Sequence, residues 1–77
     1  MFPLTITAID RIIFKGDVTS VTCRGALGEL TVLKDHVPFV TPLGEGNILV
    51  RIGGKTEIFP AAKGFLTVSR KETIILI

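Results

Sequence analysis

The sequence has 77 residues and a mass of 8.3 kDa, with nine Lys and Arg against seven Asp and Glu, one His and one Cys. Its 47% apolar and 21% charged residues exclude a mainly disordered chain, and its length allows a single domain with a small core. The lone cysteine excludes an internal disulfide, and one cysteine with one histidine excludes the usual four-ligand structural zinc site.

The sequence shows no membrane-spanning stretch and no secretion signal. Its longest unbroken apolar run is 74–77, far below the roughly 20 residues that cross a bilayer. The N-terminus has no basic segment followed by a long apolar stretch. We therefore expect a protein that is made and kept in a cytosol-like compartment.

The residue types favour strands over helices. The chain has ten Ile, seven Val and nine Thr, whose β-branched side chains suit a pleated sheet, against four Ala and no Gln. Gly and Pro recur so often that only 4–15 and 65–77 are free of them for more than nine positions. A helix of average length therefore has almost no place in the chain.

Apolar and polar residues alternate with a period of two, which predicts short strands. Asp10 and Arg11 interrupt the first hairpin, the Gly53-Gly54 pair predicts a tight turn, and 69–72 form a polar hairpin connection. The prolines of 34–47 predict that this segment is neither strand nor tight turn. The expected strands are 4–8, 12–14, 18–23, 30–33, 48–52, 56–59, 65–68 and 73–77.

These elements predict an all-β fold in one domain over residues 1–77. About eight short strands without crossover helices make a small antiparallel β-sandwich of two packed sheets, or a barrel.

The sequence offers little for catalysis or for a cofactor. The one candidate nucleophile of note, Cys23, is interpreted as buried filler, and the only histidine, His36, as a loop side chain bonded to backbone. Asp35 and His36 are neighbours and point apart on an extended segment, so they make a poor dyad. We predict no catalytic residue, no metal site and no cofactor.

The basic residues are scattered, and the chain has no Trp, no Tyr and five Phe. Binding of single-stranded nucleic acid by a small β-barrel would require stacking aromatics and clustered cations. Phe59 and Phe65 are the one pair of rings that could share a face. We expect no nucleic acid partner, and keep a basic β-barrel or sandwich module that binds single-stranded nucleic acid or another protein as the alternative.

A resemblance to a known family gives a sharper expectation. Residues 28–46, Gly-Glu-Leu-Thr-Val-Leu-Lys-Asp-His-Val-Pro-Phe-Val-Thr-Pro-Leu-Gly-Glu-Gly, resemble a segment of the epsilon subunit of F-type ATP synthases. The flanking strands agree in order, up to a Lys-Gly-Phe-Leu-Thr-Val run at 63–68 that is similar to a Gly-Gly-Phe-Leu run in the family. The likeness extends over nearly the whole chain.

The resemblance implies the N-terminal β-sandwich of a non-catalytic rotor subunit in the central stalk. Its implied partners are the gamma subunit and the c-ring, so that proton translocation is coupled to ATP synthesis. The chain would be a monomer in isolation and would lie, through the complex, on the cytoplasmic face of the bacterial plasma membrane. The family's inhibitory helical hairpin is not expected in these 77 residues.

The resemblance also suggests contact residues. Glu29 corresponds to the acidic residue near the c-ring loops, with His36 and Pro38 in a turn beside it. For gamma, we expect an exposed apolar sheet face that includes Phe39, Leu43 or Leu49. The chain departs from the family where Lys34-Asp35 replace Pro-Gly, where Lys63-Gly64 replace Gly-Gly and in the turn at 22–27.

Overall fold

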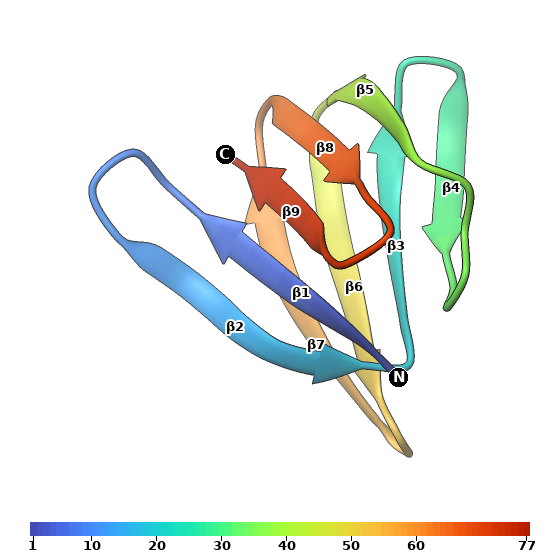
Figure 1. Ribbon diagram of the computed structural model, residues 1–77. Helices are drawn as coiled ribbons and strands as arrows, with labels where there is room; N and C mark the ends of the chain where they lie inside the picture. Colours follow the sequence, from blue (N-terminus) through green and yellow to red (C-terminus); the bar gives the residue numbers. More distant parts are fainter.

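The computed structural model describes all 77 residues, which form nine strands and no helix (Figure 1). No helix is present that is long and apolar enough to cross a membrane. The strands are β1 (Phe2–Thr7), β2 (Ile12–Val18), β3 (Ser20–Gly25), β4 (Gly28–Val32), β5 (Phe39–Leu43), β6 (Gly46–Ile52), β7 (Lys55–Ala61), β8 (Gly64–Val68) and β9 (Thr73–Leu76).

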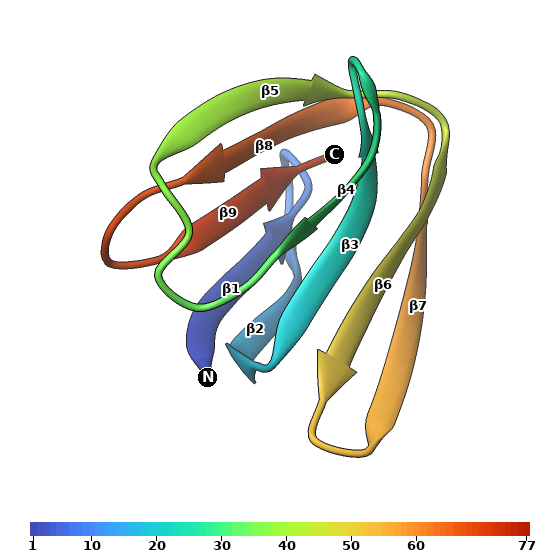
Figure 2. The same ribbon diagram turned by 90° about the vertical axis from the view of Figure 1, so that its right-hand side faces the viewer.

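The strands lie in two facing layers (Figures 1 and 2). One layer has the order β2-β1-β9-β8-β5, and the other has the order β4-β3-β6-β7. The layers are joined at one corner, because β5 meets β3 at a single residue pair, Gly25 with Leu43. The predicted two-layer β-sandwich is confirmed, and its two sheets form one hydrogen-bonded path that folds over at this corner.

One pairing departs from the predicted antiparallel pattern. Strand β9 runs parallel to β1, with Leu4 opposite Thr73 and Thr7 opposite Leu76, whereas all other pairs are antiparallel. The last strand thereby enters the gap between the first strand and β8. Parallel pairing requires a long connection, and here the whole intervening chain supplies it.

The core fills the space between the layers. Strand β1 shows how the sequence builds it, because Phe2, Leu4 and Ile6 are buried while the threonines between them are not. At the edge opposite the corner, the rings of Phe14 on β2 and Phe59 on β7 contact each other, with centroids 5.7 Å apart. The buried apolar residues are Phe2, Leu4, Ile6, Val18, Val21, Cys23, Val32, Leu43, Ile48, Val50, Leu66, Val68 and Ile75.

Two strand predictions are corrected. The expected strand 18–23 is divided at Thr19, where the chain passes from one layer to the other. At this point the Thr19 N–H donates a hydrogen bond to the Arg51 carbonyl, and the Thr19 hydroxyl accepts one from Gly53 N–H. Residues 39–43, expected to lie outside the sheet, form β5. Pro42 is tolerated because β5 pairs along its length only with β8 and leaves its other side largely free.

The predicted turns are confirmed. Gly53 has a φ of +61° in the two-residue connection between β6 and β7, which a side chain would adopt only with strain. In the 69–72 connection, the Ser69 hydroxyl and N–H both donate to the Glu72 carbonyl. The N–H of Glu72 donates back to the Ser69 hydroxyl.

Candidate functional site

Glu29 lies at the start of β4, beside the two-residue turn that joins β3 to β4. Its side chain is exposed, and Arg24 is its direct partner across the strands. The two side chains form no ion pair, since the single ion pair of the structure joins Asp10 and Arg11. The carboxylate of Glu29 is therefore free to meet a group on another molecule.

Arg24 has a different role at this corner. Its stem packs over the bend between β5 and β6: a Cβ on Gly46 would lie 3.7 Å from the Cβ of Arg24, and one on Gly44 would lie 3.9 Å from its Cδ. The Arg24 carbonyl accepts a hydrogen bond from Gly44 N–H. The bend is thus held against β3 without a salt bridge.

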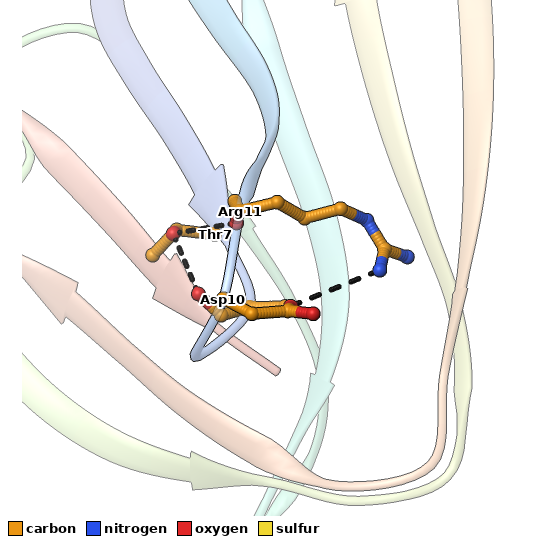
Figure 3. Close-up of polar contacts among 4 residues, drawn as sticks. Thr7, Asp10 and Arg11 are labelled. Carbon is orange, nitrogen blue, oxygen red and sulfur yellow. Dashed lines mark hydrogen bonds and ion pairs between the residues drawn. The ribbon is translucent and has the colours of Figure 1, made fainter.

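The single ion pair belongs to the turn between β1 and β2 (Figure 3). A guanidinium nitrogen of Arg11 lies 3.8 Å from a carboxylate oxygen of Asp10. Both side chains are exposed, so the ion pair adds little stability. The Thr7 hydroxyl closes the turn by donating to the carbonyls of Ala8 and Arg11. This cluster consists of turn contacts, with no group placed for chemistry.

His36 and Pro38 follow the opposite end of β4 from Glu29. A β-turn closed by His36 N–H and the Leu33 carbonyl places Asp35 at a φ of +66°. The Nδ1 of His36 bonds the Val37 carbonyl, and its ring lies 5.0 Å from the ring of Phe39. The interpretation of His36 as a loop side chain bonded to backbone is confirmed.

The three residues expected at the c-ring are therefore not gathered in one place. His36 and Pro38 line a groove of about 560 Å³ formed with the 69–72 turn and the N-terminus, and Glu29 does not line it. The expectation that the His36 turn lies beside Glu29 is wrong, because the length of β4 separates them. The separation follows from hydrogen bonding of 28–32 to β3 as an extended strand.

The three residues expected at gamma also occupy different places. Leu43 is only 6% exposed and belongs to the core, because it sits at the corner where β5 meets β3. Phe39 is half-buried and packs against the core from the same side of β5. Leu49 points outward from β6, opposite Ile58 on β7. Of the three residues, Leu49 alone lies on an outer sheet face, and the expectation of an exposed side chain is corrected for Leu43, which the corner buries.

A larger apolar face lies on the outside of the other layer. Val40, Thr67 and Ile74 form one row across β5, β8 and β9, and Pro42, Phe65 and Leu76 form the next. Phe65 is 53% exposed, and Val40 and Leu76 are exposed as well. We call this surface the β8 face; its apolar residues are Val40, Pro42, Phe65, Ile74 and Leu76.

The β8 face was not expected from the sequence, although a signal for it exists. Residues 74–76 of the apolar run 74–77 lie on strand β9. A strand with apolar side chains on both sides is typical of a sheet that is covered on both faces, so the run indicates a partner on the outer face. Alternation assigns Ile75 to the core and leaves Ile74 and Leu76 outside. The partners of these residues on β8 and β5 become visible only from the strand register.

The candidate nucleophile Cys23 is enclosed. Its side chain is buried inside β3, and desolvation by burial raises the pKa of the thiol from 9.0 to about 11. A thiol with such a pKa is a poor nucleophile near neutral pH. No three His, Cys, Asp or Glu side chains are grouped so that they could hold a metal ion.

The phenylalanines do not form a stacking platform. Phe59 points inward to Phe14, whereas Phe65 points outward on β8, so they do not share a face. Phe2 is buried, and Phe39 is half-buried beside His36. The geometry considered for single-stranded nucleic acid is therefore absent.

Comparison with known proteins identifies the family. The family model described as the ATP synthase delta/epsilon chain β-sandwich domain matches residues 1–77. The chain belongs to this family. Among curated proteins, it is 34% identical over 76 residues to the ATP synthase epsilon chain of Dichelobacter nodosus, covering 97% of this chain and 53% of that one. It is 38% identical over 72 residues to that of Caulobacter vibrioides, covering 94% and 84%.

Solved structures agree with this ATP synthase family assignment. A chain of the Euglena gracilis mitochondrial ATP synthase, solved as OSCP, F1 and c-ring, aligns with a TM-score of 0.90 and 32% identity, over 97% of this chain and 49% of that one. A chain of the Tetrahymena thermophila central stalk and c-ring, 13% identical, shows the same fold with a TM-score of 0.78. The chain spans about half the length of most of the curated relatives that it matches, the Dichelobacter nodosus protein among them.

Proposed function

We propose that this chain is a non-catalytic rotor subunit of an F-type ATP synthase that links the gamma subunit to the c-ring. In this role it couples proton translocation to ATP synthesis, as a peripheral part of the complex on the cytoplasmic face of the bacterial plasma membrane. The observation that carries the proposal is the family match over residues 1–77. It is supported by the likeness to a chain in an ATP synthase solved with its F1 part and c-ring.

The β8 face is the surface that we assign to gamma. It offers apolar side chains on three adjacent strands, and exposed apolar patches of this kind mark protein interfaces. The opposite outer face offers a smaller apolar pair, Leu49 and Ile58, next to the hydrogen-bonded hydroxyls of Thr22 and Thr31. The β8 face therefore has more apolar surface to bury against a partner.

The test is co-elution of this chain with the gamma subunit in size-exclusion chromatography at moderate salt. Phe65→Ser should abolish the one-to-one peak, because it removes the largest apolar side chain of the β8 face. Ile58→Ser is the matched control: Ile58 is 59% exposed, close to the 53% of Phe65, but lies on the other face. Loss of the peak with Ile58→Ser alone would move the gamma surface to the Leu49 side. Absence of any complex with the unmodified chain would contradict the proposal.

The end of the sandwich that carries Glu29 is the one that we assign to the c-ring. Its carboxylate is exposed and has no ion-pair partner, while Arg24 holds the adjacent bend in place. Exposed charges of this kind set docking orientation and association rate more than affinity. His36 and Pro38 are not part of this proposed contact, since they lie beyond the other end of β4.

A binding assay between the gamma-bound chain and detergent-solubilised c-ring tests this assignment. Glu29→Gln should slow association and reduce its dependence on salt, because screening then has less charge to act on. Glu57→Gln on the exposed strand β7 removes the same charge elsewhere and should have no effect. Equal behaviour of both variants would remove Glu29 from the interface.

A further inference from the structure

The groove at the end of the sandwich opposite Glu29 collects cations from three separate parts of the chain. It is lined by the N-terminus, the turn after β4 and the turn between β8 and β9. Lys34 lines it from the first turn, Arg70 and Lys71 line it from the second, and Met1 contributes the terminal amine. The sequence showed only scattered basic residues, and the fold brings these together.

The cations of the groove are not neutralised by the protein. Asp35 and Glu72 line the same groove, so four positive groups face two carboxylates, and none of them takes part in an ion pair. Lys34, Arg70 and Lys71 are exposed at the rim, where a hollow surface concentrates the field of like charges. The groove therefore carries an excess of positive charge that a bound anion would balance.

The backbone of the two turns leaves further donors available. Each turn is closed by one backbone–backbone hydrogen bond, from His36 N–H to the Leu33 carbonyl and from Ser69 N–H to the Glu72 carbonyl, and the Ser69 hydroxyl adds two more bonds in the second turn. The N–H groups at the turn tips, of residues 34, 35, 70 and 71, make no backbone hydrogen bond. His36 is half-buried with Nδ1 bonded to the Val37 carbonyl, so Nε2 is left for another partner.

From this arrangement we propose that the groove binds a phosphate-bearing anion. Phosphate oxygens accept hydrogen bonds from lysine and arginine side chains, which line this groove from two turns whose tip N–H groups have no backbone partner. The volume of about 560 Å³ accommodates a diphosphate or a phospholipid headgroup. The exposed apolar side chains of Met1, Leu33 and Val37 also line the groove, and they leave both a free diphosphate and a lipid headgroup possible as the source of the phosphate. This site does not depend on the rotor function and uses neither Glu29 nor any residue of the β8 face.

The first experiment is a titration of the isolated chain with inorganic pyrophosphate, followed by the amide NMR resonances. Saturable shifts are expected at residues 34–36 and 70–72. The triple variant K34Q/R70Q/K71Q should weaken binding about tenfold or more, because hydrogen bonds to charged groups are lost. The control K15Q/K55Q/K63Q removes the same net charge outside the groove and should change affinity by less than about twofold at moderate salt.

The second experiment separates the two sources of phosphate. Vesicles of phosphatidylcholine with phosphatidylglycerol, and vesicles of phosphatidylcholine alone, are sedimented with each variant. Binding that requires phosphatidylglycerol and is lost only in the groove variant assigns the site to a lipid headgroup, whereas pyrophosphate binding without vesicle binding assigns it to a free phosphate. Absence of both, or equal losses in the two triple variants, would overturn the proposal.

Discussion

Gly64 lies directly against the backbone carbonyl of Leu76, where β8 pairs with β9. A Cβ on residue 64 would overlap the carbonyl oxygen, and no flexible side chain is there to move aside. At residue 64, the absence of a side chain therefore lets the two strands approach this closely.

Gly64→Ala should destabilise the protein. The added methyl group forces β8 and β9 apart, and overpacking of this kind costs about 1–3 kcal/mol in the free energy of unfolding. Urea denaturation followed by circular dichroism measures the change. Gly54→Ala is the control, because a Cβ there meets no atom within 4 Å and its φ is not in the left-handed region. A Gly64→Ala variant as stable as the control would contradict the close approach of β8 and β9 at this position.

Asp35 occupies a left-handed position that glycine holds in the family pattern. At a φ of +66°, the backbone of residue 35 is strained by the presence of a side chain. Glycine avoids this strain, and a β-branched residue increases it. We expect Asp35→Val to lower stability by about 1–2 kcal/mol and Asp35→Gly to leave it unchanged or raise it by about 0.5 kcal/mol. Thermal unfolding distinguishes the two. Equal melting temperatures would mean that residue 35 is not left-handed in solution.

Burial of the Cys23 thiol predicts a loss of stability at alkaline pH. Its pKa is raised from 9.0 to about 11, so below pH 9 the thiol keeps its proton in both the folded and the unfolded chain. Between pH 9 and 11 only the unfolded chain releases it, and the free energy of unfolding should fall by about 2–3 kcal/mol. Urea titrations across this range measure the slope. Cys23→Ala, although less stable throughout, should lack this component, and an identical slope would refute the assignment.

The contact between Phe14 and Phe59 closes the edge of the sandwich opposite the β3–β5 corner. Their rings are 5.7 Å apart and tilted by 58°, a geometry typical of favourable aromatic pairs. A double-mutant cycle with Phe14→Leu and Phe59→Leu should give a coupling energy of about 0.5–1.5 kcal/mol. The same cycle with Phe14 and Phe65, which face different sides, should give none. Additive effects of Phe14 and Phe59 would indicate that this edge is open.

The strand content was predictable because local alternation determines which side chains face the core. Leu4 and Ile6 alternate with threonines, and the Gly53-Gly54 pair marks its hairpin without any knowledge of the partner strands. Pro42 led to a wrong prediction for β5, since proline excludes a central strand but not one that is paired mainly on one side. Local sequence does not say which side of a strand is paired.

The surfaces were harder to predict than the strands. Leu43 had the apolar character of an interface residue, but the corner formed with Gly25 buries it. The sequence allows Phe65 to share a face with Phe59, but the register with Pro42 and Leu76 places Phe65 on the outside. Lys34 and Arg70 are 36 positions apart in the sequence, and only the folded chain brings both to one groove. Each of these outcomes depends on non-local pairing.

The position of β9 between β1 and β8 also constrains how the protein acquires its structure. Strand β1 can form its hairpin with β2 early, but its layer stays incomplete until residues 73–76 have been synthesised and inserted beside it. A topology with so many distant contacts folds slowly, because the ends of a long loop must meet first. During translation, the nascent chain would therefore expose the unpaired hydrogen-bonding edge of β1 until β9 is added.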